Sequence, residues 1–304
     1  MNIKDLKSEE LGKGKLYERF LANGFQATEL ARAIETIEKM KKDKAYIYFG
    51  FTANLVATGL RGLIKELCEK KFVDAIVTTS GSIDHDIIRT FQEYEIATFN
   101  EDDSELFEKG YNRIGNVLVK SEGFTKLEGK MTPFLKKCLS EKKIWSPSEL
   151  LKKLGETLDE SSFLYWAAKN KIPVYCPGIT DGAAFGLQLH FFKEENPDFV
   201  IDVTADLKPL LDSALNAEKT GAIILGGGIS KHHIIGSNIV REGLDYATYI
   251  STAQEFDGSL SGARPKEAKS WGKLKGESKS VHVNCDATIA FPIIYKALKE
   301  KGLL

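Results

Sequence analysis

Short apolar runs rich in β-forming residues alternate with helical patterns from residue 45 onward, and this alternation limits the possible folds most strongly. Strands that are buried on both faces of a sheet need nearly continuous apolar runs, and helices between such runs are typical of a parallel sheet. The runs lie at residues 45–51, 72–79, 172–178, 198–204, 221–227, 246–252 and 280–286. The sequence therefore predicts an α/β fold, a doubly wound, mainly parallel, Rossmann-like sheet with helices on both faces.

Two segments fall outside this alternation. Residues 1–40 are helical and charged in pattern, and residues 100–165 are helical and lysine-rich, with breaks at Pro133 and Pro147. Both segments keep aromatic and leucine residues at helical spacing, which is unlike a flexible linker. We expect a single α/β NAD-binding domain over residues 1–304, with an N-terminal helical extension at 1–40 and a helical insertion at 100–165.

The charge balance and the apolar runs exclude several kinds of partner. The 304 residues include 42 basic and 43 acidic side chains, a net charge of −1, so no overall field attracts nucleic acid or anionic lipid. No apolar run approaches the ~18 residues that a membrane span needs, and the N-terminus lacks a signal-peptide pattern. The four cysteines lack the spacing of a zinc site. We expect a cytoplasmic protein without bound metal, nucleic acid or membrane.

The junctions that follow the predicted strands are rich in small, hydrogen-bonding residues. In open parallel sheets, ligands bind at the carboxyl ends of the strands. Three junctions, "LGGGISKHH", "TTSGS" and "TDGAAFG", have glycines where a helix begins, and a helix N-terminus suits a phosphate group. The acidic residue that a dinucleotide fingerprint places after its second strand is missing, and the acids stand instead at Asp181 and Asp286. The pattern favours a dinucleotide such as NAD, held in a non-standard way.

The segment "SGARPKEAKSWGKLKG", residues 261–276, contains a candidate nucleophile. Pro265 and Glu267 favour the first turn of a helix, which Gly272 then ends. Lysine attacks carbonyl or imine carbon only when it is neutral, and nearby cations or an apolar wall lower a lysine pKa. Lys273 follows Trp271, which would supply such a wall. The alternative is that Lys273 is one more solvated lysine, as we interpret Lys266, Lys269 and Lys275.

Five segments resemble the signature segments of the deoxyhypusine synthase family, in the same order and at nearly the same spacing. In chain order they are "TTSG", "NRIGNVLV", "IPVYCPGITDG", "ILGGGISKHHI" and "TAQEFDGSLSGARPKEAKSWGKL". The resemblance implies that NAD takes a hydride from spermidine, that 1,3-diaminopropane leaves, and that an enzyme lysine holds the aminobutyl unit as an imine. This unit then passes to one lysine of a translation factor precursor. The resemblance also implies a homotetramer, a dimer of dimers, with active sites at subunit interfaces.

The resemblance assigns roles to residues of this chain. Lys273 would form the imine, and His232 would act as the base. Polyamine contacts would come from Asp257, Gly258, Ser261, Glu267 and Trp271. NAD contacts would come from Ala53, Asn54, Leu55, Val56, Ala57, Thr79, Ser80, Gly81, Asp181, Gly227, Thr252, Ala253, Asp286 and Ala287.

The chain departs from the eukaryotic members at three positions where they have acids, namely His85, Gly186 and Leu260. Asp84, Asp86 or Gln188 would have to compensate, and we include Asp84 among the substrate-binding residues. These departures indicate a prokaryotic, archaeal-type member. Two alternatives stay open: a homospermidine synthase-like enzyme that delivers the same unit to putrescine, and an NAD-binding protein that has lost catalysis. The sequence does not distinguish a protein acceptor from a free diamine.

Overall fold

The computed structural model describes residues 2–8 and 16–304, which form two compact units. Unit 1 contains the described residues of 1–51 together with 72–77 and 208–304, and unit 2 contains 52–71 and 78–207. The predicted extension at 1–40 falls in unit 1, although its residues 1 and 9–15 lie outside the described residues, and the predicted insertion at 100–165 falls in unit 2. The organisation of residues 1–304 as a single domain stays a prediction.

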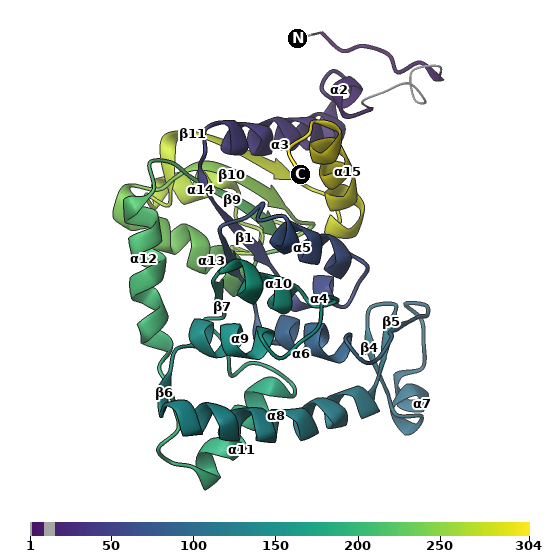
Figure 1. Ribbon diagram of the computed structural model, residues 1–304. Helices are drawn as coiled ribbons and strands as arrows, with labels where there is room; N and C mark the ends of the chain where they lie inside the picture. Colours follow the sequence, from purple (N-terminus) through teal and green to yellow (C-terminus); the bar gives the residue numbers. More distant parts are fainter. Residues whose placement is uncertain (1, 9–15) are drawn as a thin grey trace. The chain divides into compact units, whose positions relative to one another are not determined.

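Unit 1 is built on parallel strands that are hydrogen-bonded in the order β11-β10-β9-β1-β2 (Figure 1). The strands are β1 (Tyr46–Phe51), β2 (Ala75–Val77), β9 (Thr220–Leu225), β10 (Leu244–Ile250) and β11 (Leu274–Val283). The order reverses between β1 and β9, because β2 follows β1 on one side whereas β10 and β11 follow β9 on the other. Ligands bind at such a switch point in open α/β sheets.

Helices cover both faces of these strands, as successive residues of β1 show. Phe49 stacks on Phe291 of α15, with 5.8 Å between the ring centroids. The next residue, Gly50, points to the opposite face, where an added Cβ would lie 2.7 Å from Ile234 of α13. Unit 1 contains the helices α2 (Leu16–Phe20), α3 (Phe25–Lys42), α13 (Gly228–Ser237), η2 (Asn238–Arg241), α14 (Pro265–Ser270) and α15 (Ala287–Glu300), and most of α12 (Leu207–Asn216). This arrangement confirms the predicted α/β fold, a mainly parallel sheet with helices on both faces.

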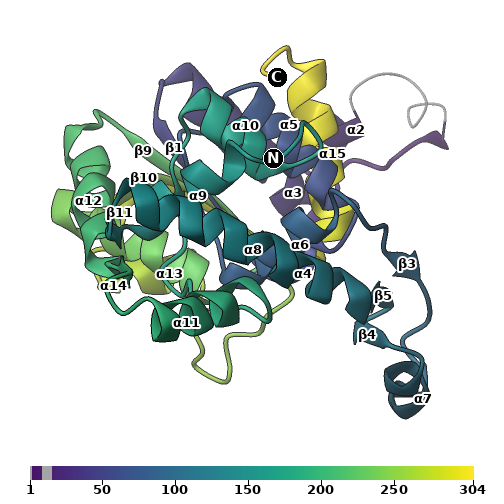
Figure 2. The ribbon, with the colours of Figure 1, turned by 60° about the horizontal axis from the view of Figure 1, so that its bottom comes forward.

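Unit 2 is mainly helical. Its helices are α4 (Ala53–Val56), α5 (Leu60–Glu69), α6 (Ser80–Ile88), α7 (Asp103–Glu108), α8 (Ser121–Glu141), α9 (Pro147–Gly155), α10 (Phe163–Asn170), α11 (Phe185–Glu195) and η1 (Val203–Asp206). The short strands β3 (Glu95–Ile96), β5 (Val117–Lys120) and β4 (Tyr111–Ile114) form an antiparallel sheet, and α7 contacts β4 (Figure 2). The strand β7 (Val174–Tyr175) lies in the predicted run at 172–178. Among the described residues, no helix has the length and apolar character to cross a membrane.

One predicted strand behaves differently from the others. The run at 198–204 forms only β8 (Val200–Ile201), which pairs in parallel with β6 (Ile144–Trp145) in a separate two-stranded sheet. Asp202 ends the strand, because its side chain accepts hydrogen bonds from the backbone N–H groups of Thr204 and Ala205 and so begins η1. A local capping interaction therefore overrides the apolar pattern.

Candidate active site

The backbone around Lys273 is fixed by the end of one helix and the start of a strand. Helix α14 ends at Ser270, and Gly272 adopts a φ of 65°, a left-handed conformation that glycine tolerates best. The backbone N–H of Lys273 donates to the carbonyl oxygen of Ala268 at 3.0 Å, and β11 begins at the next residue, Leu274. The helix break predicted at Gly272 is confirmed, and it holds Lys273 between two regular elements.

Lys273 and His232 lie within hydrogen-bonding distance of each other. Lys273 Nζ is 3.2 Å from His232 Nε2 and 5.3 Å from the centroid of the Trp271 ring. Burial, and then the positive charge of Lys273, lower the pKa of His232 below its usual value. Neutral imidazole is the form that accepts a proton, so the structure places a base directly beside an amine.

A small hollow of about 20 Å³ lies beside this pair. A cavity of that size holds roughly one water molecule. Trp271 at its edge is 65% exposed, so the indole faces outward rather than into a closed core. A ligand longer than a water molecule therefore needs space beyond this hollow. The lining residues are Lys231, Ile235, Leu260, Ala263, Arg264, Glu267, Ala268, Trp271 and Lys273.

The glycine turn after β9 is pressed against the loop that precedes α14. The backbone N–H of Gly228 donates to Ser261 Oγ at 3.0 Å, and a Cβ on Gly227 would lie 2.6 Å from the Cα of Ser261. On the same loop, Asp257 Oδ1 accepts from the backbone N–H of Ser259 at 2.7 Å, and Gly258 has a φ of 71°. Gly227, which is predicted to contact NAD, and Ser261, which is predicted to contact the polyamine, therefore lie side by side.

The remaining cofactor candidates of unit 1 lie at the ends of β10 and β11. Thr252 and Ala253 follow β10, and the N–H of Ala253 donates to Ser251 Oγ at 3.1 Å. Asp286 caps α15 by accepting from the N–H of Thr288 at 2.7 Å, and Ala287 is the first residue of that helix. Since β9, β10 and β11 are adjacent and parallel, their carboxyl ends bring these residues to one edge of the sheet.

Unit 2 brings the other cofactor candidates together from three segments. Residues 53–56 form α4, Ala57 ends it, and Thr79 precedes Ser80 and Gly81 at the start of α6. Ser80 Oγ donates to the carbonyl oxygen of Ile179 at 2.8 Å, in the turn that contains Asp181. A Cβ on Gly81 would lie 3.0 Å from the Cβ of Ala53, so α4 and α6 approach closely.

Asp84 and His85 in α6 are buried and bonded to neighbours within unit 2. Both carboxylate oxygens of Asp84 accept backbone N–H groups that begin α11, from Phe185 at 2.8 Å and Ala184 at 3.3 Å. These contacts give Asp84 a capping role, and a substrate contact of Asp84 stays a prediction. His85 Nδ1 is 2.8 Å from Tyr94 Oη, and burial, followed by the charge of Arg89, lowers the pKa of His85 to about 4.

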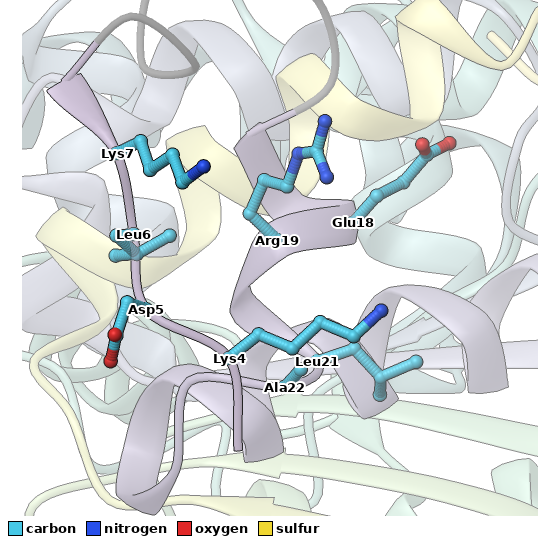
Figure 3. Close-up of a pocket in the computed structure, with 8 residues that line it drawn as sticks. All are labelled: Lys4, Asp5, Leu6, Lys7, Glu18, Arg19, Leu21 and Ala22. Atoms are coloured by element: carbon cyan, nitrogen blue, oxygen red, sulfur yellow. The ribbon is translucent and has the colours of Figure 1, made fainter. Parts of the chain in front are cut away.

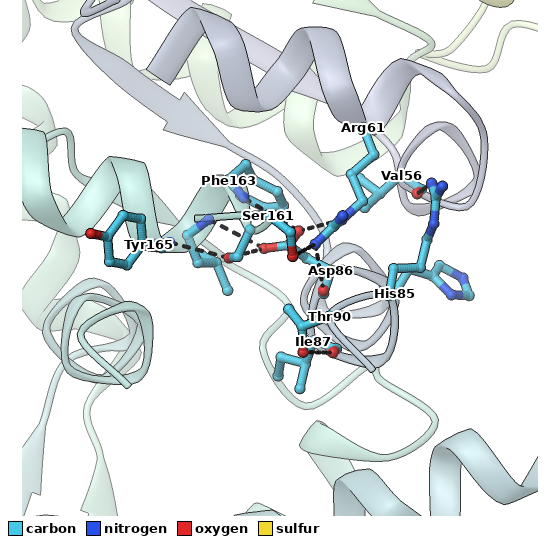
Figure 4. A network of polar contacts seen from close by, with 12 residues as sticks. Val56, Arg61, His85, Asp86, Ile87, Thr90, Ser161, Phe163 and Tyr165 are labelled. Carbon is cyan, nitrogen blue, oxygen red and sulfur yellow. Dashed lines mark hydrogen bonds and ion pairs between the residues drawn. The ribbon is translucent and has the colours of Figure 1, made fainter. Parts of the chain in front are cut away.

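Asp86 lies in a buried polar network, which Figure 4 shows. It accepts from Arg61 Nε at 2.7 Å and from Ser162 Oγ at 2.6 Å, and also from the first backbone N–H groups of α10 at Phe163 and Leu164. Asp84 and Asp86 thus bind the N-terminal N–H groups of two different helices, α11 and α10. In the part of the chain that the structure describes, no group of three or more His, Cys, Asp or Glu side chains is arranged to hold a metal ion.

A larger hollow of about 580 Å³ lies elsewhere in unit 1, between the N-terminal segment and α2 (Figure 3). Lys4, Lys7 and Arg19 line it together with Asp5 and Glu18. The charged side chains that line it are of mixed sign, and none of the residues predicted for catalysis or binding is among its described lining residues. Volume alone therefore does not identify the reactive site of this protein.

Sequence reasoning missed Lys231 and Arg264, which line the small hollow. Lys231 is 2% exposed although it directly precedes His232. A usable signal was present, because Lys231 lies in the first turn of a helix, where the helix dipole disfavours a cation. A lysine in such a place needs a specific partner, and only the tertiary structure identifies it.

Comparison with known proteins identifies the family. A family model described as deoxyhypusine synthase matches residues 15–298. The deoxyhypusine synthase of Senecio vernalis is 44% identical over 92% of this chain and 84% of its own length. A probable deoxyhypusine synthase of Thermoplasma volcanium is 49% identical, over 89% of this chain and 88% of its own length. The crystal structure of an Entamoeba histolytica protein described as a deoxyhypusine synthase matches with a TM-score of 0.69 and 31% identity, covering 97% of this chain and 96% of that one. This chain therefore belongs to the deoxyhypusine synthase family.

Proposed function

We propose that this chain is a deoxyhypusine synthase, which transfers the 4-aminobutyl group of spermidine through an imine on Lys273 to a lysine of a translation factor precursor. Family membership supports this reaction. The observation on which the proposal depends most is the distance of 3.2 Å between Lys273 Nζ and His232 Nε2. An amine beside a neutral base is what covalent catalysis through lysine requires.

The side chains divide the chemistry between them. His232 accepts the proton that the secondary amine of spermidine loses as the amine is oxidised to an imine. Lys273 loses its ammonium proton and adds to the imine carbon, and 1,3-diaminopropane takes up a proton as its bond to that carbon breaks. The aminobutyl group stays on Lys273 Nζ until the acceptor lysine adds to the same carbon and Lys273 leaves. NAD, when bound, supplies the redox chemistry by taking up the hydride and returning it to the final imine.

The strand ends of unit 1 fit a dinucleotide. Helices α13 and α15 begin there, and the N–H groups at a helix N-terminus bind phosphate oxygens. A Cβ added at Gly228 would meet nothing within 4 Å, so open space lies beside the start of α13. The proposed NAD-binding residues are Gly227, Thr252, Ala253, Asp286 and Ala287 in unit 1, and Ala53, Asn54, Leu55, Val56, Ala57, Thr79, Ser80, Gly81 and Asp181 in unit 2.

The proposed polyamine contacts of unit 1 include two carboxylates. Glu267 lines the small hollow, and Asp257 lies on the loop before α14. Each would pair with an ammonium group of the substrate, and such charge-assisted hydrogen bonds are stronger than neutral ones. Gly258 and Ser261 would contact the part of the polyamine that lies between its ammonium groups. The exposed indole of Trp271 would stack on the polyamine.

The three departures from the eukaryotic acids have local explanations. His85 bonds with Tyr94, and Leu260 lines the small hollow. Gly186 has no room for a side chain, because its Cβ would lie 2.5 Å from the carbonyl oxygen of Thr180. We infer that polyamine recognition in this chain depends on Glu267 and Asp257 more than it does in eukaryotic relatives.

A protein acceptor and a homotetramer complete the proposal. An acceptor that is a translation factor precursor places the reaction in the cytoplasm. Phe256 and Trp271 are 87% and 65% exposed beside the proposed polyamine site. Exposed aromatic side chains at a functional site favour coverage by another protein surface, which supports an active site at a subunit interface. Sedimentation is expected to give four times the 33.8 kDa mass of the chain.

Borohydride trapping tests cofactor, substrate and nucleophile together. The protein is incubated with spermidine and NAD, reduced with borohydride, digested and mapped by mass spectrometry. We expect one reduced aminobutyl adduct on Lys273, and none when NAD is omitted or in a Lys273→Arg variant. An unmodified Lys273 in a protein that binds NAD would overturn the proposal. Radiolabelled spermidine with a precursor protein or with putrescine then identifies the acceptor, and label found only in homospermidine would exclude the protein acceptor.

A further inference from the structure

Lys231 in α13 has a buried ammonium group bonded to the loop that precedes α14. Its Nζ donates to the carbonyl oxygen of Leu260 at 2.8 Å and to that of Ala263 at 2.6 Å. The residue is 2% exposed, and its Nζ lies 4.6 Å from the centroid of the buried Tyr249 ring. The ammonium group therefore contacts backbone and aromatic groups instead of solvent.

The loop at residues 259–263 is shaped to present these two carbonyls. The N–H groups of Gly262 and Ala263 both donate to the carbonyl oxygen of Ser259 at 3.2 Å, which closes a turn. Between the two carbonyls, Ser261 accepts the hydrogen bond from the backbone of Gly228 at the start of α13. The loop is thus attached to α13 at two places, through Lys231 and through Ser261.

Burying an ammonium group costs free energy unless the group is well paired. The burial of Lys231 therefore indicates that its hydrogen bonds to the loop have a specific role. Burial lowers the pKa of Lys231 to about 8, with a further decrease from Arg264 and an opposing increase from the carboxylate of Glu267. Burial lowers the pKa of His282 on β11, and the charges of Arg264 and then Lys231 lower it further. Tyr249 offsets part of the cost through a cation–π contact.

The same two segments carry the proposed reactive pair. Helix α13 contains Lys231 and His232 in succession, whereas the segment from Ser259 through α14 leads to Lys273. The contact of 3.2 Å between Lys273 Nζ and His232 Nε2 joins these two segments directly. The hydrogen bonds of Lys231 and Ser261 are further polar contacts that join α13 to this segment.

We propose that Lys231 is a positioning residue, which holds the loop at 259–263 against α13 so that Lys273 stays aligned with His232 and the substrate throughout the reaction. The positioning effect on catalysis rests on the proposed function, whereas the attachment of the loop does not. A misplacement of about 1 Å can slow an enzymatic step by roughly a hundredfold. The loss should therefore fall on the rate of imine formation more than on substrate affinity.

Amide hydrogen exchange of the free protein tests the attachment without requiring any reaction. In Lys231→Met, the amides of residues 258–264 are expected to exchange at least tenfold faster than in wild type. Lys269→Met is the matched control, since Lys269 Nζ donates to the carbonyl oxygen of Gly276 at 2.7 Å on the surface of the same region. This control should leave exchange in 258–264 unchanged. Unchanged exchange in Lys231→Met would overturn the proposal.

Single-turnover trapping tests the catalytic consequence. Lys231→Met is expected to slow formation of the adduct on Lys273 by about a hundredfold while KM for spermidine changes less than threefold. Faster loop exchange with a wild-type trapping rate would overturn the positioning role. If Lys231→Met does not fold, Lys231→Gln takes its place, because its side-chain amide still provides a hydrogen-bond donor. Lys231→Gln is expected to show a smaller change in the same direction. Wild-type values of both the loop exchange rate and the trapping rate in this variant would overturn the proposal. Absence of any adduct in wild type would count against the proposed function, while the exchange result would still decide the attachment.

Discussion

At the residue scale, the contact between Lys273 and His232 predicts a measurable shift in the titration of the imidazole. Burial is the larger cause that lowers the pKa of His232, and the charge of Lys273 is the second. Replacing Lys273 by Met removes only the second cause, so the pKa of His232 should rise but stay below about 6.5. NMR titration of the imidazole ring protons in both proteins measures this. A pKa that falls or stays constant would show that the charge of Lys273 does not reach the ring.

Gly272 offers a second prediction at this scale. Its φ of 65° is unfavourable for other L-residues, while an added Cβ would meet nothing within 4 Å. Gly272→Ala should therefore lower the free energy of unfolding by about 1–2 kcal/mol through backbone strain without a steric clash. Gly276→Ala is the matched control, since its Cβ also enters open space but its φ is not left-handed. Urea denaturation compares the two, and equal stabilities would contradict the strain argument.

At the element scale, the start of α10 depends on Asp86. This carboxylate is paired with Arg61 and accepts from the first N–H groups of the helix (Figure 4). Asp86→Asn leaves the buried guanidinium of Arg61 without its counter-charge, and breaking such a pair typically costs about 3–5 kcal/mol. The expected result is a large decrease in the free energy of unfolding, measured by urea denaturation.

An exposed ion pair provides the control for that prediction. Asp103 accepts two hydrogen bonds from Arg113 in unit 2, and its side chain is 64% exposed. Solvent screens a pair of this kind, so Asp103→Asn should cause a much smaller loss. Equal losses in the two variants would mean that burial does not determine the value of the Asp86 pair.

At the scale of the whole molecule, NAD should stabilise the folded chain. A ligand that binds only the native state raises the free energy of unfolding by about 2.7 kcal/mol at a hundred times its Kd. Thermal unfolding with increasing NAD is expected to show a rising Tm, whereas nicotinamide alone, which lacks the phosphates, should have little effect. A Tm that does not respond to NAD would contradict the cofactor proposal without bearing on the fold.

Several features of this chain follow from the sequence by local rules. The apolar runs that become β1, β9 and β10 are nearly continuous, because strands covered on both faces allow few polar residues. The helix that ends before Lys273 follows from Pro265 and Gly272, whose effects on the backbone are local. Family resemblance then assigned the reactive roles to Lys273 and His232, which stay predictions, and the structure places Lys273 Nζ 3.2 Å from His232 Nε2.

Other features were decided only by the tertiary structure. Lys275 was interpreted as solvated, yet its Nζ forms an ion pair with Asp245 at 2.7 Å. Asp84 caps α11, a hundred residues away in the chain, and Lys231 is bonded to a loop some thirty residues further on. Periodicity and capping patterns report interactions within a few residues, so they show where strands and helices begin and end. A buried charge is stabilised by groups that only folding brings near it, and the partners of Lys231 and Asp84 therefore could not be predicted from the sequence.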